Sequence, residues 1–131
     1  MSGVSTLRSY QDVSTQTSVA DDAVGPIALV AARTGWATYI QRILVNVGTS
    51  ATETVTLQSD GTGALVLAIL PVDSPLGVIT FDFGEDGVLL PAGEGLEAVL
   101  SDDGYALTIV VQAYRKLPPD ASVTVATAQN R

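Results

Sequence analysis

The sequence predicts an all-β protein, and three observations lead to this prediction. Valine and threonine are abundant, with 17 and 14 copies, whereas the 131 residues contain one lysine and four glutamates. Val and Thr suit the half-buried surface of a pleated sheet, while helix surfaces are usually rich in Lys and Glu. Short aliphatic and β-branched runs also alternate with segments rich in Gly, Asp, Pro and Ser, about ten residues apart. This spacing is typical of a sandwich or a barrel.

The elements follow in order along the chain. Residues 1–22 are rich in Ser and Thr and poor in apolar side chains, so we expect an extended arm or a disordered terminus there. Residues 23–116 are expected to form one sandwich domain whose eight strand-like runs are Ile27–Arg33, Trp36–Val47, Thr52–Ser59, Ala64–Leu70, Val78–Phe83, Val88–Leu90, Leu96–Leu100 and Tyr105–Tyr114. Two prolines end the last run, and the alternating segment Ser122–Thr127 within the tail, residues 117–131, could add an edge strand to its own sheet or to a neighbour's.

Alternation within the runs predicts which side chains face the core. In the second run it places Tyr39 on the same face as Ile43 and Val45. Two segments are apolar on both faces, Ala64–Leu70 and Leu107–Val111, as in strands that are covered on both sides. We therefore expect another subunit, or the chain's own arms, to cover their outward side chains, such as Val66 and Leu70 or Thr108 and Val110.

The composition excludes many kinds of chemistry. The sequence has no Cys and no His, which removes cysteine nucleophiles, thiolate metal sites and the commonest general base at neutral pH. A net charge of −8 argues against direct binding of nucleic acid, because phosphate contacts need clustered Lys and Arg. The longest apolar stretch, Ala64–Val72, is too short to span a membrane. The N-terminal stretch lacks the basic start and apolar run of a signal peptide, so we expect synthesis in a cytoplasm.

Acidic residues dominate the middle of the chain. Residues 43–114 contain ten Asp and Glu and no Lys or Arg. The densest group is Asp82, Glu85 and Asp86, which we interpret as a turn without a metal because the spacing matches no calcium motif. No serine or paired-carboxylate arrangement suggests catalysis, so neither an enzyme nor a cofactor is predicted. We interpret Trp36 as an anchor of a core or an interface, with sugar stacking as the alternative.

The basic residues lie outside this acidic interval and suggest an attachment side. Together with a short contact string in the arm, they form our predicted capsid or subunit contacts, which are Leu7, Arg8, Tyr10, Val13, Arg33, Arg42, Arg115 and Lys116. Extended segments of this kind can bind a groove or a sheet edge of a neighbouring protein.

One stretch of the chain resembles a known class of proteins. Residues 43–114 run from Ile-Leu-Val-Asn-Val through Phe81-Asp-Phe-Gly84 and Gly87-Val-Leu-Leu-Pro91 to Val110-Val-Gln-Ala-Tyr114. In its residue pattern and in the order of its strands and turns, this stretch resembles small β-sandwich virion proteins of tailed bacteriophages, especially head decoration (cement) proteins. The resemblance implies a jelly-roll-like antiparallel sandwich, a homotrimer, a position on the capsid surface of the virion, and a role in clamping neighbouring major capsid proteins. The alternative is a carbohydrate- or receptor-binding sandwich of a phage tail or fibre.

Overall fold

The computed structural model describes residues 10–52, 54–62, 64–101 and 103–117, and this part of the chain contains strands and no helix. In chain order the strands are β1 (Tyr10–Asp12), β2 (Thr15–Val19), β3 (Gly25–Val30), β4 (Ala37–Thr49), β5 (Val55–Ser59), β6 (Val66–Leu70), β7 (Gly77–Asp82), β8 (Val88–Leu89), β9 (Leu96–Leu100) and β10 (Ala106–Lys116). Each of the eight predicted runs overlaps one of these strands, with ends that differ by a few residues. Within the same residues, no helix that could cross a membrane is found.

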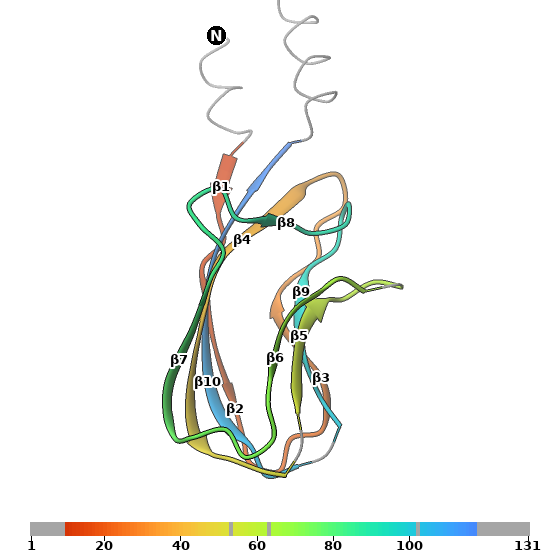
Figure 1. The fold of residues 1–131 in the computed structure, drawn as a ribbon. Coiled ribbons are helices and arrows are strands. Elements are labelled where there is room, and N and C mark those ends of the chain that lie inside the picture. The colour runs from red at the N-terminus through yellow and green to blue at the C-terminus, as the bar shows by residue number, and fades with distance from the viewer. Residues whose placement is uncertain (1–9, 53, 63, 102, 118–131) are drawn as a thin grey trace, which may run out of the picture.

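The strands form two antiparallel sheets that pack face to face (Figure 1). The larger sheet has the order β1-β10-β4-β7, with β2 also paired to β10 and β8 also paired to β4. The smaller sheet has the order β3-β9-β5-β6. The predicted all-β, antiparallel sandwich is therefore confirmed.

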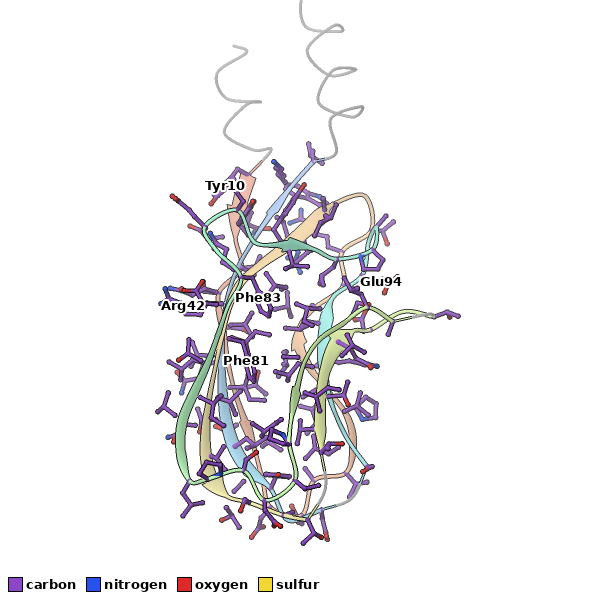
Figure 2. All side chains as sticks on the ribbon, in the orientation of Figure 1. Tyr10, Arg42, Phe81, Phe83 and Glu94 are labelled. Atoms are coloured by element: carbon purple, nitrogen blue, oxygen red, sulfur yellow. The ribbon has the colours of Figure 1, made fainter. Side chains whose placement is uncertain are left out.

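The hydrophobic core lies between the two sheets. Alternate residues of β4, β5, β9 and β10 point inward, as the period of two requires, and the side chains buried to 1% exposure or less include Ile43, Leu57, Ala98, Ile109 and Val111. Phe81 and Phe83 of the β7 side also point into this space (Figure 2). Each fully buried aliphatic side chain contributes about 1.5–3 kcal/mol relative to an exposed one, so this layer is what holds the sheets together.

The N-terminal segment differs from the expected arm. Residues 10–12 pair with the end of β10, and residues 15–19 pair with its first half. Val19 is 4% exposed in the core, and Val13 packs against the core as well. Residues 10–22 therefore belong to the sandwich. The backbone groups along the edge of β10 need hydrogen-bond partners, which these residues supply, and Val13 and Val19 anchor them to the core. Residues 1–9, with Leu7 and Arg8, and the tail from residue 118 lie outside the described residues.

Two irregularities in strand pairing change the predicted faces. Opposite Gln112 and Ala113, β4 contains an extra residue, Gln41, so Tyr39 faces away from the core although Ile43 and Val45 face into it. A second irregularity lies between Leu57 and Gln58 in the pairing of β5 with β6. Leu67 is the extra residue on β6, so Val66 and Leu70 lie on opposite faces of the sheet. Leu70 points into the core at 1% exposure, and the prediction that it faces outward is wrong. Val66 and Ile69 of β6 face outward and are about half exposed.

Candidate docking site

Seven aromatic and basic side chains gather at the end of the sandwich where β1 begins and β10 ends. We call this group the aromatic–cationic end, and its members are Tyr10, Arg33, Trp36, Tyr39, Tyr114, Arg115 and Lys116. Figure 2 shows Tyr10 at this end, away from the bulk of the core. The group comes from β1, β4, β10 and the connection between β3 and β4, so only the folded chain brings it together.

Three tyrosines stack across neighbouring strands on the outer face of the larger sheet. Tyr114 of β10 pairs in register with Tyr39 of β4, and their ring centroids are 4.9 Å apart with an interplanar angle of 7°. On its other side Tyr114 stacks on Tyr10 of β1, at 5.3 Å and 18°. The Tyr114 hydroxyl donates a hydrogen bond to the Asp86 carbonyl oxygen at 2.7 Å. Both ring faces of Tyr114 are therefore covered, and this tyrosine stack is held in one arrangement.

The neighbourhood of the tyrosine stack affects its ionisation. Burial, followed by the nearby Tyr39, Asp86 and Tyr10, raises the pKa of Tyr114 above its ordinary value of 10.0. Desolvation, followed by the charge and hydrogen bond of Asp12, raises the pKa of Tyr10 as well. At neutral pH the hydroxyls of both residues are therefore protonated and able to donate hydrogen bonds.

A tight turn places the second aromatic–cation pair. Residues 33–36 form this turn, in which the Trp36 N–H donates to the Arg33 carbonyl oxygen at 3.2 Å. The turn brings the Arg33 guanidinium carbon to 4.1 Å from the centroid of the Trp36 ring. Arg33 also donates to Gln11 Oε1 of β1 at 2.5 Å. Arg33 is thus fixed against an aromatic face and tied to the adjacent strand.

Arg115 is a buried cation within the aromatic–cationic end. It is 8% exposed, and its Nη2 donates to the Ala31 carbonyl oxygen, while its Nε has no hydrogen-bond partner among the described residues. Thr38, its register partner on β4, is buried and its Oγ1 is also unpaired. Burial, followed by repulsion from Arg33, lowers the pKa of Arg115 from its ordinary value. The two arginines are therefore close enough to interact.

Among the described residues, the cations at this end form no salt bridge with a carboxylate. Lys116 is exposed, with its Nζ 5.0 Å from the centroid of the Tyr39 ring. Among the residues that the structure describes, Arg42 with Asp82 is the one pair of opposite charges within 4.0 Å, at 3.8 Å. Arg33, Arg115 and Lys116 therefore have no carboxylate partner in this part of the molecule, although the chain carries 14 acidic residues.

An apolar hollow of about 510 Å³ opens beside these charges. Its lining includes Thr34, Trp36, Tyr39, Leu89, Leu90 and Ala92. Leu89 of β8 pairs in register with Tyr39 and is 50% exposed. The two aromatic rings of the lining are the ones that Arg33 and Lys116 lie over, so the hollow combines an apolar interior with cations beside its walls.

The acidic loop, residues 82–86, lies against the outer face of the larger sheet. Gln41 donates to the Glu85 carbonyl oxygen at 2.7 Å, and the Gly84 N–H donates to Asp82 Oδ1 at 2.9 Å. In the described part of the chain, no three Asp or Glu residues are arranged to hold a metal ion. The loop forms one side of a polar hollow of about 520 Å³, to which Asp12 and Arg42 also belong.

Four of the predicted contact residues come together at the aromatic–cationic end, namely Tyr10, Arg33, Arg115 and Lys116. Arg42 does not join them, because it is on the open sheet face beside Asp82, where Figure 2 shows it pointing away from the core. Val13 is partly buried against the core and is not available as an arm contact. Tyr39 and Tyr114 are not among the contact residues predicted from the sequence. The bulge at Gln41 turns Tyr39 outward beside Tyr114, and this bulge leaves no signal in the sequence.

Comparisons with known proteins leave the function open. No family model matches the chain, and no curated protein matches it. The chain is similar to a solved structure of the Drosophila NLP-core, described in connection with pentamer formation and histone binding, with 12% identity, a TM-score of 0.40, and coverage of 79% of this chain and 96% of that one. It is also similar to the N-terminal cellulose-binding domain of Cellulomonas fimi β-1,4-glucanase C, with 16% identity, a TM-score of 0.36, and coverage of 82% and 89%. At these values neither likeness carries an argument about function.

Proposed function

We propose that this chain is a non-enzymatic docking protein of a virion that decorates and stabilises a phage capsid by binding across major capsid protein subunits. The capsid and the virion location come from the sequence resemblance. The observation that supports a docking role is the aromatic–cationic end, where three tyrosines, a tryptophan and three cations gather, with no described carboxylate within 4.0 Å of these cations. Tyr, Trp and Arg are the residues that most often carry the binding energy of protein interfaces.

The geometry of the rings favours a protein partner over a carbohydrate. A sugar ring stacks on an open aromatic face, but both faces of Tyr114 and one face of Trp36 are already covered. The tyrosine stack instead offers ring edges, which suit packing against a protein surface. The polar hollow beside the acidic loop is the feature that keeps the carbohydrate- or receptor-binding alternative in consideration.

We also propose self-association as a homotrimer through the outer face of the smaller sheet. One row across this face is formed by Pro26, Val99, Thr56 and Ile69, which pair in register across four strands and carry no charge. Ile69 is 52% exposed and Val66 beside it is 48% exposed. The neighbouring row contains Val66, Gln58 and Glu97, whose carboxylate accepts a hydrogen bond from Gln58. Molecules with a net charge of −8 repel one another, so contact between copies is least unfavourable when it is centred on the charge-free row.

Capsid binding tests the docking role directly. Empty expanded capsids of the parent phage, free of decoration protein, are titrated with the full chain and with a Tyr10→Ser, Lys116→Gln double variant. Both side chains are exposed, so the fold should persist, and we expect at least a tenfold loss of affinity. The matched control is Gln16→Ala, Asn46→Ala, which changes two exposed residues of the same sheet face away from the aromatic–cationic end. Failure of the unaltered chain to bind capsids, together with binding to an oligosaccharide array, would replace the proposal by the alternative.

A further inference from the structure

The apolar hollow has the features of a pocket for a side chain. Trp36, Tyr39 and Leu89 contribute to its lining, and its volume of about 510 Å³ is large enough to accept one bulky side chain. Interface hot spots commonly consist of an aromatic or aliphatic anchor that fills such a pocket while its surroundings exclude water. A hollow open to solvent in the isolated protein is therefore available to a partner.

The charges around the hollow specify the partner further. Arg33 and Lys116 lie over the two rings of its lining, and neither has a described carboxylate partner. Arg115 pairs in register with Thr38, the residue next to Tyr39, and is a third, buried cation without a described carboxylate partner. Cations that are partly desolvated by a partner are stabilised when that partner supplies carboxylates.

We propose that this hollow binds one bulky apolar side chain flanked by acidic residues on a segment of the partner protein. The inference rests on the proposed docking function and names the chemistry of the segment that is docked. Charge complementarity selects this occupant over the chain's own first nine residues, which contain Arg8 and no acid. A basic segment would instead add positive charge to an end that already holds three cations without a described carboxylate partner.

The experiment uses Trp36 as the reporter, because it is the single tryptophan of the chain and lines the hollow. The full chain is titrated with three peptides of sequence Glu-Glu-Phe-Glu-Glu, Glu-Glu-Ala-Glu-Glu and Lys-Lys-Phe-Lys-Lys, each acetylated and amidated. We expect the first peptide to change the Trp36 emission saturably, and the other two to bind at least tenfold more weakly. Lys116→Gln should reduce the preference for Glu over Lys. Equal binding of the acidic and basic Phe peptides would overturn the inference.

Two matched variants locate the binding. Ala92→Phe fills the hollow from an exposed loop position and should abolish binding of the acidic Phe peptide, which isothermal calorimetry measures independently of the tryptophan. Ala28→Phe adds the same ring to an exposed position of β3 and should leave binding unchanged. Equal loss in both variants contradicts a site in the hollow, and so does a Trp36 response to oligosaccharides without one to peptides.

The two proposals fail in different ways. If Ala92→Phe still binds capsids with full affinity, the hollow is not the docking pocket while the docking function stands. If the unaltered chain binds no capsid, the proposed function fails whatever the peptides do.

Discussion

Replacing Tyr114 by leucine tests whether the tyrosine stack holds the aromatic–cationic end together. Leucine keeps most of the apolar volume but removes two ring stacks and the hydrogen bond to the Asp86 carbonyl. Each stack contributes about 0.5–1.5 kcal/mol and the hydrogen bond about 0.5–1.5 kcal/mol, so the free energy of unfolding should fall by about 1.5–4.5 kcal/mol. The matched change Tyr10→Leu removes one stack from a ring that is 52% exposed, and should cost about 1 kcal/mol or less.

Urea unfolding followed by circular dichroism measures both values, and a double-mutant cycle separates the two stacks. Because Tyr10 and Tyr39 lie on opposite faces of Tyr114, each should couple to Tyr114 by about 0.5–1.5 kcal/mol, with little direct coupling between the two. The reasoning is refuted if Tyr114→Leu costs no more than Tyr10→Leu, or if Tyr10 and Tyr39 couple to each other as strongly as to the middle ring.

Four further outcomes follow from the structure. Gly95→Ala should unfold the chain or lower its melting temperature by more than ten degrees, because the new Cβ would lie 2.1 Å from the Val30 carbonyl oxygen. Gly48→Ala is the control and should be tolerated, because its Cβ would lie 3.4 Å from the nearest atom. The raised pKa of Tyr114 means that the folded chain holds the hydroxyl proton more tightly than the unfolded chain does. The stabilisation from this proton is present below about pH 10 and is lost as the pH rises through the folded-state pKa. Tyr114→Phe should therefore reduce the dependence of the free energy of unfolding on pH in alkaline solution. Neutralising the three acids of the acidic loop with Asn and Gln should leave capsid binding within about threefold, and calcium should not raise the melting temperature of the unaltered chain, as calorimetry would show. Deleting residues 2–20 should destabilise the sandwich by about 3 kcal/mol or more, because it removes β1, β2 and the buried Val19; an unchanged thermal transition would contradict the place of these strands in the fold.

Much of the fold could be predicted from local pattern. The eight runs between residues 27 and 114 each overlap a strand, because a period of two and turns marked by Gly, Asp and Pro are properties of neighbouring residues. The same reasoning failed for β1 and β2. Their Ser- and Thr-rich sequences show little apolar alternation, and they are strands because β10 offers them an unpaired edge.

The candidate site was predicted only in part. Its cations Arg33, Arg115 and Lys116 were identified because basic residues are rare in this chain and avoid its acidic middle. Arg42 lies apart from them beside Asp82, because charge and sequence position do not show which end of a sheet a strand residue occupies. Tyr39 and Tyr114 were missed because stacking depends on the register between β4 and β10.

The sequence by itself therefore determined the all-β class, the positions of eight strands, the absence of Cys and His chemistry and the scarcity of positive charge. Each of these depends on composition or on residues close together in the chain. Only the tertiary structure decided that residues 10–22 join the larger sheet, that a bulge at Gln41 turns Tyr39 outward, and that side chains from β1, β4 and β10 meet at one end. Those outcomes depend on pairing between strands more than twenty residues apart, where a shift of one residue moves a side chain from the core to the surface.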